Sequence, residues 1–244
     1  LNRTENYKNI WAWEQCDFWY KPDYVEKYFS DNREIVDKNL QDILGTDSSV
    51  FCFSVNTSSR LASLKFARLI KERKKDGVVI FGGPLFFQES WIKEILNEGI
   101  VDIVVPGEGE ITLTELVKLI QENKDKGQCK GIGFMENGKL LITEKRPLIA
   151  DLDTLPFLDF SDMPLKKYDD SLHIPIMASR GCVQRCAFCS SRSFWPGYRT
   201  MSGERIYREV MWQRSRFDDI THINFDDLLF NGNMKALVTF CDLM

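Results

Sequence analysis

The chain has 244 residues, 43% of them hydrophobic, and a formal net charge of -4 at pH 7. This length suits two α/β domains, and the acidic balance argues against nucleic acid as the main partner. No apolar run is long enough to span a membrane, and seven cysteines without a secretory signal argue against a disulfide framework, so we expect a cytoplasmic protein.

Residues 1–47 are expected to form an N-terminal helical segment. Pro22 is a predicted helix start, and Gly45 follows the last apolar residue of a helical pattern. Aromatic residues at this kind of spacing form a core more often than they line a ligand, so we favour the core interpretation and keep the ligand as the alternative. The aromatic residues are Trp11, Trp13, Phe18, Trp19 and Tyr20.

Strand and helix patterns alternate between residues 48 and 130. Buried-strand runs occur at 50–55, 78–81 and 101–105, and a helical pattern follows each of them. This alternation predicts a doubly wound parallel sheet of Rossmann-like type. Ligands of such sheets bind beyond the carboxyl ends of the strands. The candidate binding residues at these ends are Ser54, Gly82, Gly83, Gly107, Glu108 and Gly109.

Residues 131–170 are predicted to be a hairpin followed by a connector. Asn137-Gly138 lies between two apolar runs, which is a strong signal for a tight hairpin turn. Residues 146–168 contain three prolines and no helical period. We therefore expect an extended segment between two domains.

Residues 171–244 begin a second domain. A strand is expected at 174–179, a helix at 202–217 with Ser202 as its N-cap, and a second strand at 220–225. The second strand ends in Asp226-Asp227. The loop between the first strand and the helix carries a group of three cysteines.

Cys182, Cys186 and Cys189 have CxxxCxxC spacing. Three thiolates at this spacing hold three corners of a four-iron cluster and leave one iron open to another ligand. A structural zinc site is the alternative, but such sites normally close with four ligands, and no CxxC pair or nearby histidine follows.

This motif resembles the signature of the radical S-adenosylmethionine (SAM) superfamily, CxxxCxφC with an aromatic φ, here Phe188. The resemblance implies a partial (β/α) TIM barrel, a [4Fe-4S] cluster on the three cysteines, and SAM bound near Phe188. The superfamily's Gly-Gly-Glu motif is absent, and Asp226 or Asp227 is its positional substitute for binding the SAM amino group. An Asp-Asp pair at a strand end is also a common turn and capping signal. The arginines in and beside the loop, Arg180, Arg185, Arg192 and Arg199, suit an anionic cluster and carboxylate, although each is equally well explained as solvated.

The first domain resembles the cobalamin-binding domain that precedes many radical SAM domains. Gly82-Gly83 follows one strand, and Gly107-Glu108-Gly109-Glu110-Ile111-Thr112 follows the next. The resemblance implies that the six strand-end residues named above contact cobalamin. The chain has only two histidines, His173 and His222, and neither lies in an Asp-x-His-x-x-Gly motif. We therefore expect cobalt without that lower ligand, with His173 ahead of the first barrel strand, His222 inside the second, and both structural.

The family resemblance implies an enzyme that cleaves SAM reductively and transfers a methyl group to an unactivated carbon. The expected partners are a small-molecule or natural-product-type substrate and an electron donor such as flavodoxin or ferredoxin. Two alternatives remain open: another radical SAM rearrangement or cyclisation without methyl transfer, and a non-enzymatic iron-sulfur or cobalamin-binding module. Too few residues follow Cys189 to complete a barrel, so we expect the barrel to be truncated.

Overall fold

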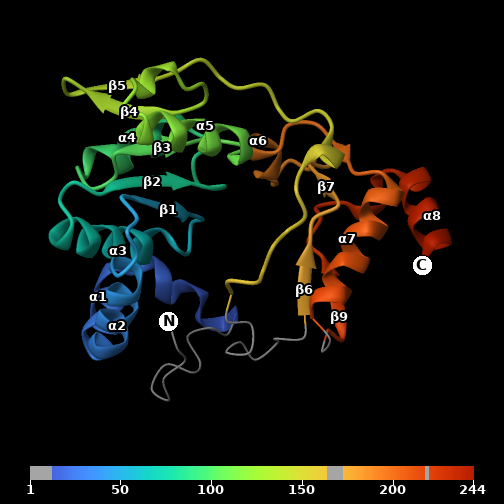
Figure 1. Ribbon diagram of the computed structural model, residues 1–244, viewed down its shortest axis with the longest axis horizontal. Coiled ribbons are helices and arrows are strands. Elements are labelled where there is room, and N and C mark those ends of the chain that lie inside the picture. The colour runs from blue at the N-terminus through green and yellow to red at the C-terminus, as the bar shows by residue number, and fades with distance from the viewer. Residues whose placement is uncertain (1–12, 164–172, 218–219) are drawn as a thin grey trace. The chain divides into compact units, whose positions relative to one another are not determined.

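The computed structural model describes residues 13–163, 173–217 and 220–244. They form two compact units that divide between Pro147 and Leu148 (Figure 1). Trp11 and the connector residues 164–170 lie outside the described part of the chain. In that part no helix is both long and apolar enough to cross a membrane.

Unit 1 contains a five-stranded sheet in the order β1-β2-β3-β4-β5. The first three strands are parallel, which confirms the predicted βα alternation, and the hairpin β4–β5 adds two antiparallel strands beside β3. The predicted turn is present, because Asn137 and Gly138 have φ values of 49° and 74°. The strands are β1 (Val50–Ser54), β2 (Val78–Gly82), β3 (Ile103–Val105), β4 (Gly133–Glu136) and β5 (Lys139–Ile142).

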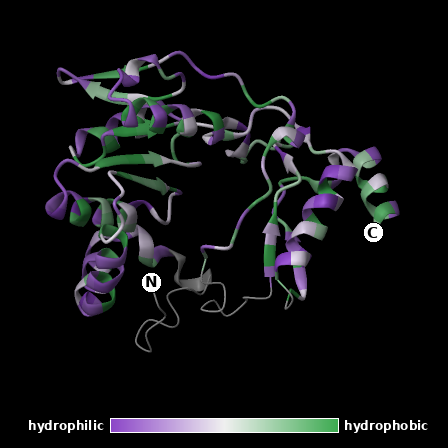
Figure 2. Cartoon of the chain, in the orientation of Figure 1, coloured by the Kyte–Doolittle hydropathy of each residue, from purple (hydrophilic) through white to green (hydrophobic). Residues whose placement is uncertain are grey.

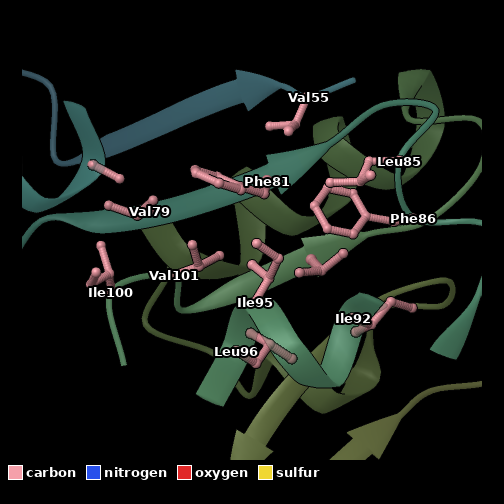
Figure 3. Packing of buried hydrophobic residues seen from close by; sticks show 12 residues of the cluster. Val55, Val79, Phe81, Leu85, Phe86, Ile92, Ile95, Leu96, Ile100 and Val101 are labelled. Carbon is pink, nitrogen blue, oxygen red and sulfur yellow. The ribbon is translucent and has the colours of Figure 1, made fainter. Parts of the chain in front are cut away.

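Helices cover both faces of this sheet. Val79 and Phe81 of β2 pack against α3 (Arg60–Arg73) and α4 (Glu89–Asn97), as Figure 3 shows for the α4 side. Ile80, between them, packs on the opposite face with α5 (Glu110–Gln121). Successive side chains of a strand point to opposite faces, so a strand covered on both sides reads as a continuous apolar run. Figure 2 shows β2 and β3 as hydrophobic.

The N-terminal aromatics form a core against α3. Trp19 and Tyr28 are buried and pack with Phe66 of α3. The core interpretation is confirmed for Phe18 and Trp19, whereas Tyr20 is 46% exposed and lies outside this core. The helices of this segment are η2 (Trp13–Tyr20), α1 (Pro22–Asp31), which begins at the predicted proline, and α2 (Arg33–Leu44), which ends before Gly45.

Unit 2 is built on two parallel strands, β6 (His173–Ile176) and β9 (His222–Phe225). The helix α7 (Gly203–Arg216) connects them in the chain, and the Ser202 side chain accepts a hydrogen bond from the Arg205 N–H, as the predicted N-cap should. The helix α8 (Met234–Leu243), which was not predicted, packs on α7. The apolar residues of both strands face these helices.

Two expectations for the first strand of unit 2 are corrected. His173 does not precede the strand but is its first residue, paired with His222. The strand expected over 174–179 is also interrupted. β6 ends at Ile176, and the chain resumes as the short strand β7 (Ser179–Arg180). The interruption arises because the Ala178 N–H donates to the Asp227 carboxylate instead of to a neighbouring strand.

Residues 149–158, here called the strap, run along α7 within unit 2. Arg205 donates to the carbonyls of Leu155 and Pro156 at 3.0 and 3.2 Å, and Glu209 accepts from the Leu158 N–H at 3.0 Å. Arg205 and Glu209 also form an ion pair of 2.7 Å, with each side chain only 2% exposed. The predicted connector therefore divides, because its hairpin joins the sheet of unit 1 and its strap packs into unit 2.

Candidate cluster and cofactor sites

The three cysteines lie on a loop whose two ends are paired to each other. β7 pairs in antiparallel fashion with β8 (Arg199–Thr200), so Ser179 lies opposite Thr200 and Arg180 opposite Arg199. Residues 181–198, between these strands, form the cysteine loop. Its only regular element among the described residues is the short helix α6 (Ser191–Phe194).

The three thiols are free and differ in exposure. Cys186 is exposed, and Cys182 and Cys189 are half-buried. The Cys182 sulfur accepts from the Gln184 N–H at 3.4 Å. Hydrogen bonds from the side chain and backbone of Ser191 lower the pKa of the Cys189 thiol, which favours the thiolate.

The thiols are not gathered around a common point. Across residues 13–163, 173–217 and 220–244, no three His, Cys, Asp or Glu side chains lie close enough to hold a metal ion. The donor set still suits an iron-sulfur cluster, because all three sulfurs are unoxidised, accessible at least in part, and carried by one irregular loop.

The other predicted residues of this loop are exposed or packed at its base. Phe188 is 92% exposed and makes no core contact. Arg180 is buried at the start of the loop, with its guanidinium 4.8 Å from the centroid of Trp195. Arg185 and Arg192 are exposed, so the outer part of the loop is cationic.

Asp226 and Asp227 occupy different environments at the end of β9. Asp227 accepts from the Ala178 N–H at 3.2 Å and from the Ser179 hydroxyl, and burial raises the pKa of its carboxyl group. Asp226 is exposed, and its own N–H donates to the Ile176 carbonyl at 2.9 Å. Asp227 thus ties β9 to the start of the cysteine loop, and Asp226 is the carboxylate directed to solvent.

Both histidines of the chain lie in unit 2. The rings of His173 and His222 are stacked edge to face with centroids 4.6 Å apart, at the amino ends of β6 and β9. The cysteine loop follows the opposite, carboxyl end of β6. Unit 1 contains no histidine in its sequence.

The strand ends of unit 1 line up at one edge of the sheet. Ser54 lies in register with Gly82, and Gly82 with Val105, so the three following loops start side by side. Gly83 and Gly107 differ in the structural reason for which glycine is needed. A Cβ at Gly83 would lie 2.7 Å from the Val55 nitrogen, so close chain packing explains Gly83. Gly107 has a φ of 81° and open space where a Cβ would point.

The open space at Gly107 is the observation that fits a bound corrin or nucleotide tail at this edge. Gly109, two residues later, has only one atom near its Cβ position, at 4.0 Å. Glu108 lies between them and is half-buried. The structure brings the six predicted cobalamin residues to one edge, although it explains Gly83 without a ligand.

Sequence reasoning missed two side-chain networks near these sites. One is the buried Arg205–Glu209 pair, and the other joins Arg146 to Thr112 and Glu115 of α5. Arg146 lies 34 positions from Thr112 and 31 from Glu115. Arg205 lies 50 positions from Leu155, whose carbonyl it binds. Only Thr112, as the last residue of the Gly-Glu-Gly-Glu-x-Thr pattern, carried a signal in the sequence.

Known proteins were compared with the chain in sequence and in structure. No protein-family model matches it. It is 32% identical over 215 residues to an uncharacterized methyltransferase of Pyrococcus horikoshii, and this alignment covers 86% of this chain and 44% of the relative. It is 28% identical over 193 residues to the anaerobic magnesium-protoporphyrin IX monomethyl ester cyclase of Synechocystis, and this alignment covers 78% of this chain and 38% of the relative.

Among solved structures, the cobalamin-dependent S-adenosylmethionine radical enzyme OxsB, with aqua-cobalamin and S-adenosylmethionine bound, matches with a TM-score of 0.68. The identity is 19%, and the match covers 85% of this chain and 30% of OxsB. The chain therefore has the fold of a cobalamin-dependent radical SAM enzyme over most of its length. This confirms the predicted fold class. The chain spans less than half the length of these relatives, at 44%, 38% and 30%.

Proposed function

We propose that this protein is a cobalamin-dependent radical SAM enzyme that methylates an unactivated carbon of a small molecule. The observation that carries the proposal is an intact CxxxCxxC motif on the loop after β6, in a chain 32% identical to a named methyltransferase. The likeness to OxsB extends over 85% of the chain, which includes both units.

Cys182, Cys186 and Cys189 would hold a [4Fe-4S] cluster with one iron open to the amino and carboxylate groups of SAM. When bound, this cluster supplies the electron that cleaves SAM reductively. The lowered pKa of Cys189 favours the thiolate that iron requires. Exposed Arg185 and Arg192 would offset the negative charge of the cluster and of the SAM carboxylate.

Phe188 and Asp226 are the residues that we assign to SAM. Phe188 is 92% exposed, and burying it against a ligand would be favourable. Asp226 is exposed at the end of β9 and would pair with the SAM ammonium group. Asp227 already accepts two hydrogen bonds within the protein, so its assignment is to hold the loop base.

Cobalamin would bind at the carboxyl edge of the sheet in unit 1. Gly107 and Gly109 leave space there for a close approach of the corrin or its tail, and Ser54, Gly82, Gly83 and Glu108 flank that space. When bound, cobalamin supplies the methyl group. Because unit 1 has no histidine, the protein would offer cobalt no imidazole ligand from this unit.

A second radical SAM reaction is supported by the cyclase of Synechocystis, which is 28% identical over 78% of this chain. In that reading the same radical closes a ring, and no methyl group is transferred. Both reactions require a reducing electron donor, for which we propose flavodoxin or ferredoxin. We also propose that the protein is cytoplasmic and does not bind nucleic acid.

Anaerobic reconstitution of the full-length protein tests the proposal. With iron, sulfide, reductant and SAM, we expect 5′-deoxyadenosine from the wild type and its loss in Cys182→Ala. Cys241→Ala is the matched control, since Cys241 is an exposed cysteine on α8 outside the motif, and it should retain both iron and activity. Absence of 5′-deoxyadenosine from the wild type would contradict the enzyme proposal.

The choice between methyl transfer and cyclisation needs a second readout. SAM labelled in its methyl group should give a labelled product. If 5′-deoxyadenosine forms and the label is recovered only in methionine and unreacted SAM, the cyclase-like reading is correct instead.

A further inference from the structure

Arg146 makes a two-point contact with the first turns of α5. Its Nε donates to the Thr112 hydroxyl at 2.8 Å, and its Nη2 donates to the Glu115 carboxylate. Thr112 and Glu115 are three residues apart and therefore share a face of the helix. One planar guanidinium thus fixes two positions of α5 at once, which a point charge on a flexible stem does less well.

The Thr112 half of this contact is shielded from water. Thr112 is 1% exposed and the Arg146 side chain 19% exposed, whereas the Glu115 side chain is 40% exposed. The Thr112 carbonyl also accepts from the fully buried Cys129 thiol, with a distance of 3.6 Å between sulfur and oxygen. Thr112 is therefore held through its side chain by Arg146 and through its backbone by Cys129.

The segment that carries Arg146 is itself anchored. Arg146 Nη2 lies 3.4 Å from the Lys130 carbonyl, and the Gly131 N–H donates to the Glu144 carbonyl at 2.8 Å. The two ends of the β4–β5 hairpin are thus joined to each other and to α5. Residues 129–131 and Arg146 together form a clasp on the start of this helix.

The clasped turn directly follows the loop 106–109, which carries Gly107, Glu108 and Gly109. The Leu113 N–H donates to the Gly109 carbonyl at 2.7 Å, so the loop is continuous with the hydrogen bonding of the clasped turn. A Cβ at Gly107 would meet nothing within 4 Å, and one at Gly109 would meet only a Val105 carbon at 4.0 Å. A shift of the clasped turn would be transmitted to the loop through the hydrogen bond between Leu113 and Gly109.

We propose that Arg146 is a positioning residue for the cobalamin loop 106–109, and that it acts through Thr112. This explains why a threonine ends the Gly-Glu-Gly-Glu-x-Thr pattern, because its hydroxyl is the acceptor for Arg146. The inference rests on the proposed cobalamin site for its consequence in binding. Its structural part, control of the loop by Arg146, stands on unit 1 alone.

Hydrogen-deuterium exchange in the full-length protein without cobalamin tests the structural part. Arg146→Met should speed the exchange of amides in residues 107–113 about tenfold, as expected when local opening becomes easier by the value of a charged hydrogen bond. Arg73→Met is the matched control, because Arg73 forms a comparable ion pair with Asp37, 2.9 Å long, away from this loop. Unchanged exchange in Arg146→Met would overturn the proposal.

Cobalamin affinity, followed by its absorbance, tests the consequence. We expect Arg146→Met and Thr112→Val each to weaken cobalamin binding about tenfold. The double variant should bind little more weakly than either, because both single variants remove the same hydrogen bond between Arg146 and Thr112. Arg146→Lys should recover only part of the affinity. Additive effects, or a loss in Arg73→Met equal to that in Arg146→Met, would overturn the role through Thr112.

The two proposals fail in different ways. If the wild type binds no cobalamin, the proposed cofactor is wrong, and the exchange experiment still decides whether Arg146 positions the loop. If Arg146→Met does not fold, hydrogen-deuterium exchange and cobalamin affinity are both measured on Thr112→Val. This variant removes only the hydroxyl that accepts from Arg146 and keeps the shape of the side chain.

Discussion

At the scale of single residues, equal spacing in the sequence conceals unequal environments. The spacing of the CxxxCxxC motif does not distinguish its cysteines, yet Cys186 is exposed while Cys182 and Cys189 are half-buried, and hydrogen bonds from Ser191 lower the pKa of the Cys189 thiol. Asp226 and Asp227 are likewise adjacent, but one is exposed and the other is bound by the loop base. The sequence indicated these groups as candidates and could not distinguish their environments, because the environments depend on backbone turns.

Asp227 gives a pH prediction at this scale. Burial raises the pKa of its carboxyl group, so the folded protein holds that proton more tightly than the unfolded chain does. Its stabilising contribution is therefore complete below the unfolded pKa, whose reference value is 3.8, and is lost as the pH rises through the folded value. The free energy of unfolding of wild type minus that of Asp227→Asn should fall as the pH rises from 3.8.

Urea unfolding at a series of pH values measures this difference. Asp226→Asn serves as the neighbouring control, and at a fixed neutral pH it should change the free energy of unfolding by no more than about 0.5 kcal/mol, as is usual for exposed sites. A difference between wild type and Asp227→Asn that rises with pH would show that hydrogen bonding to Ser179, not burial, dominates.

At the scale of elements, the strap is the feature that the sequence did not predict. The three prolines and the lack of a helical period over residues 146–168 indicated an extended connector, but Arg205 and Glu209 bind the backbone of the strap with both side chains buried. Removing one member of a buried ion pair leaves an unpaired charge, so Arg205→Met should lower the free energy of unfolding by about 3–5 kcal/mol.

Arg216→Met, on the same helix, is the control for the strap. Arg216 pairs with Asp159 at 3.5 Å, and both side chains are well exposed, so its loss should cost no more than about 1 kcal/mol. Equal destabilisation by the two variants in chemical unfolding would contradict the view that the strap is held by a buried pair.

Local patterns predicted most of the other elements. Apolar runs indicated β1 to β3, Asn137-Gly138 indicated the hairpin, and Ser202 marked the start of α7. Contacts between distant residues set what the sequence missed. Ala178 bonds to Asp227 and interrupts the first strand of unit 2, and the clasp of Arg146 on Thr112 crosses 34 positions.

At the scale of the whole molecule, two cofactor motifs occur in two separately packed units of one chain. The sequence predicted two units and the fold class, because strand-helix alternation, glycines at strand ends and cysteines at a fixed spacing are local signals. The sequence did not reveal the substrate, since a pocket is assembled from distant side chains. The comparisons, which span less than half of the relatives, leave methyl transfer as our proposal.

The central claim is that the three cysteines hold a cluster with one iron open to SAM. Electron paramagnetic resonance of the reduced, reconstituted full-length protein tests it most directly, because SAM binding at that iron changes the cluster's g values. We predict a spectrum that shifts when SAM is added to the wild type and no such cluster signal in Cys182→Ala. A wild-type cluster whose spectrum stays the same at saturating SAM would contradict the account.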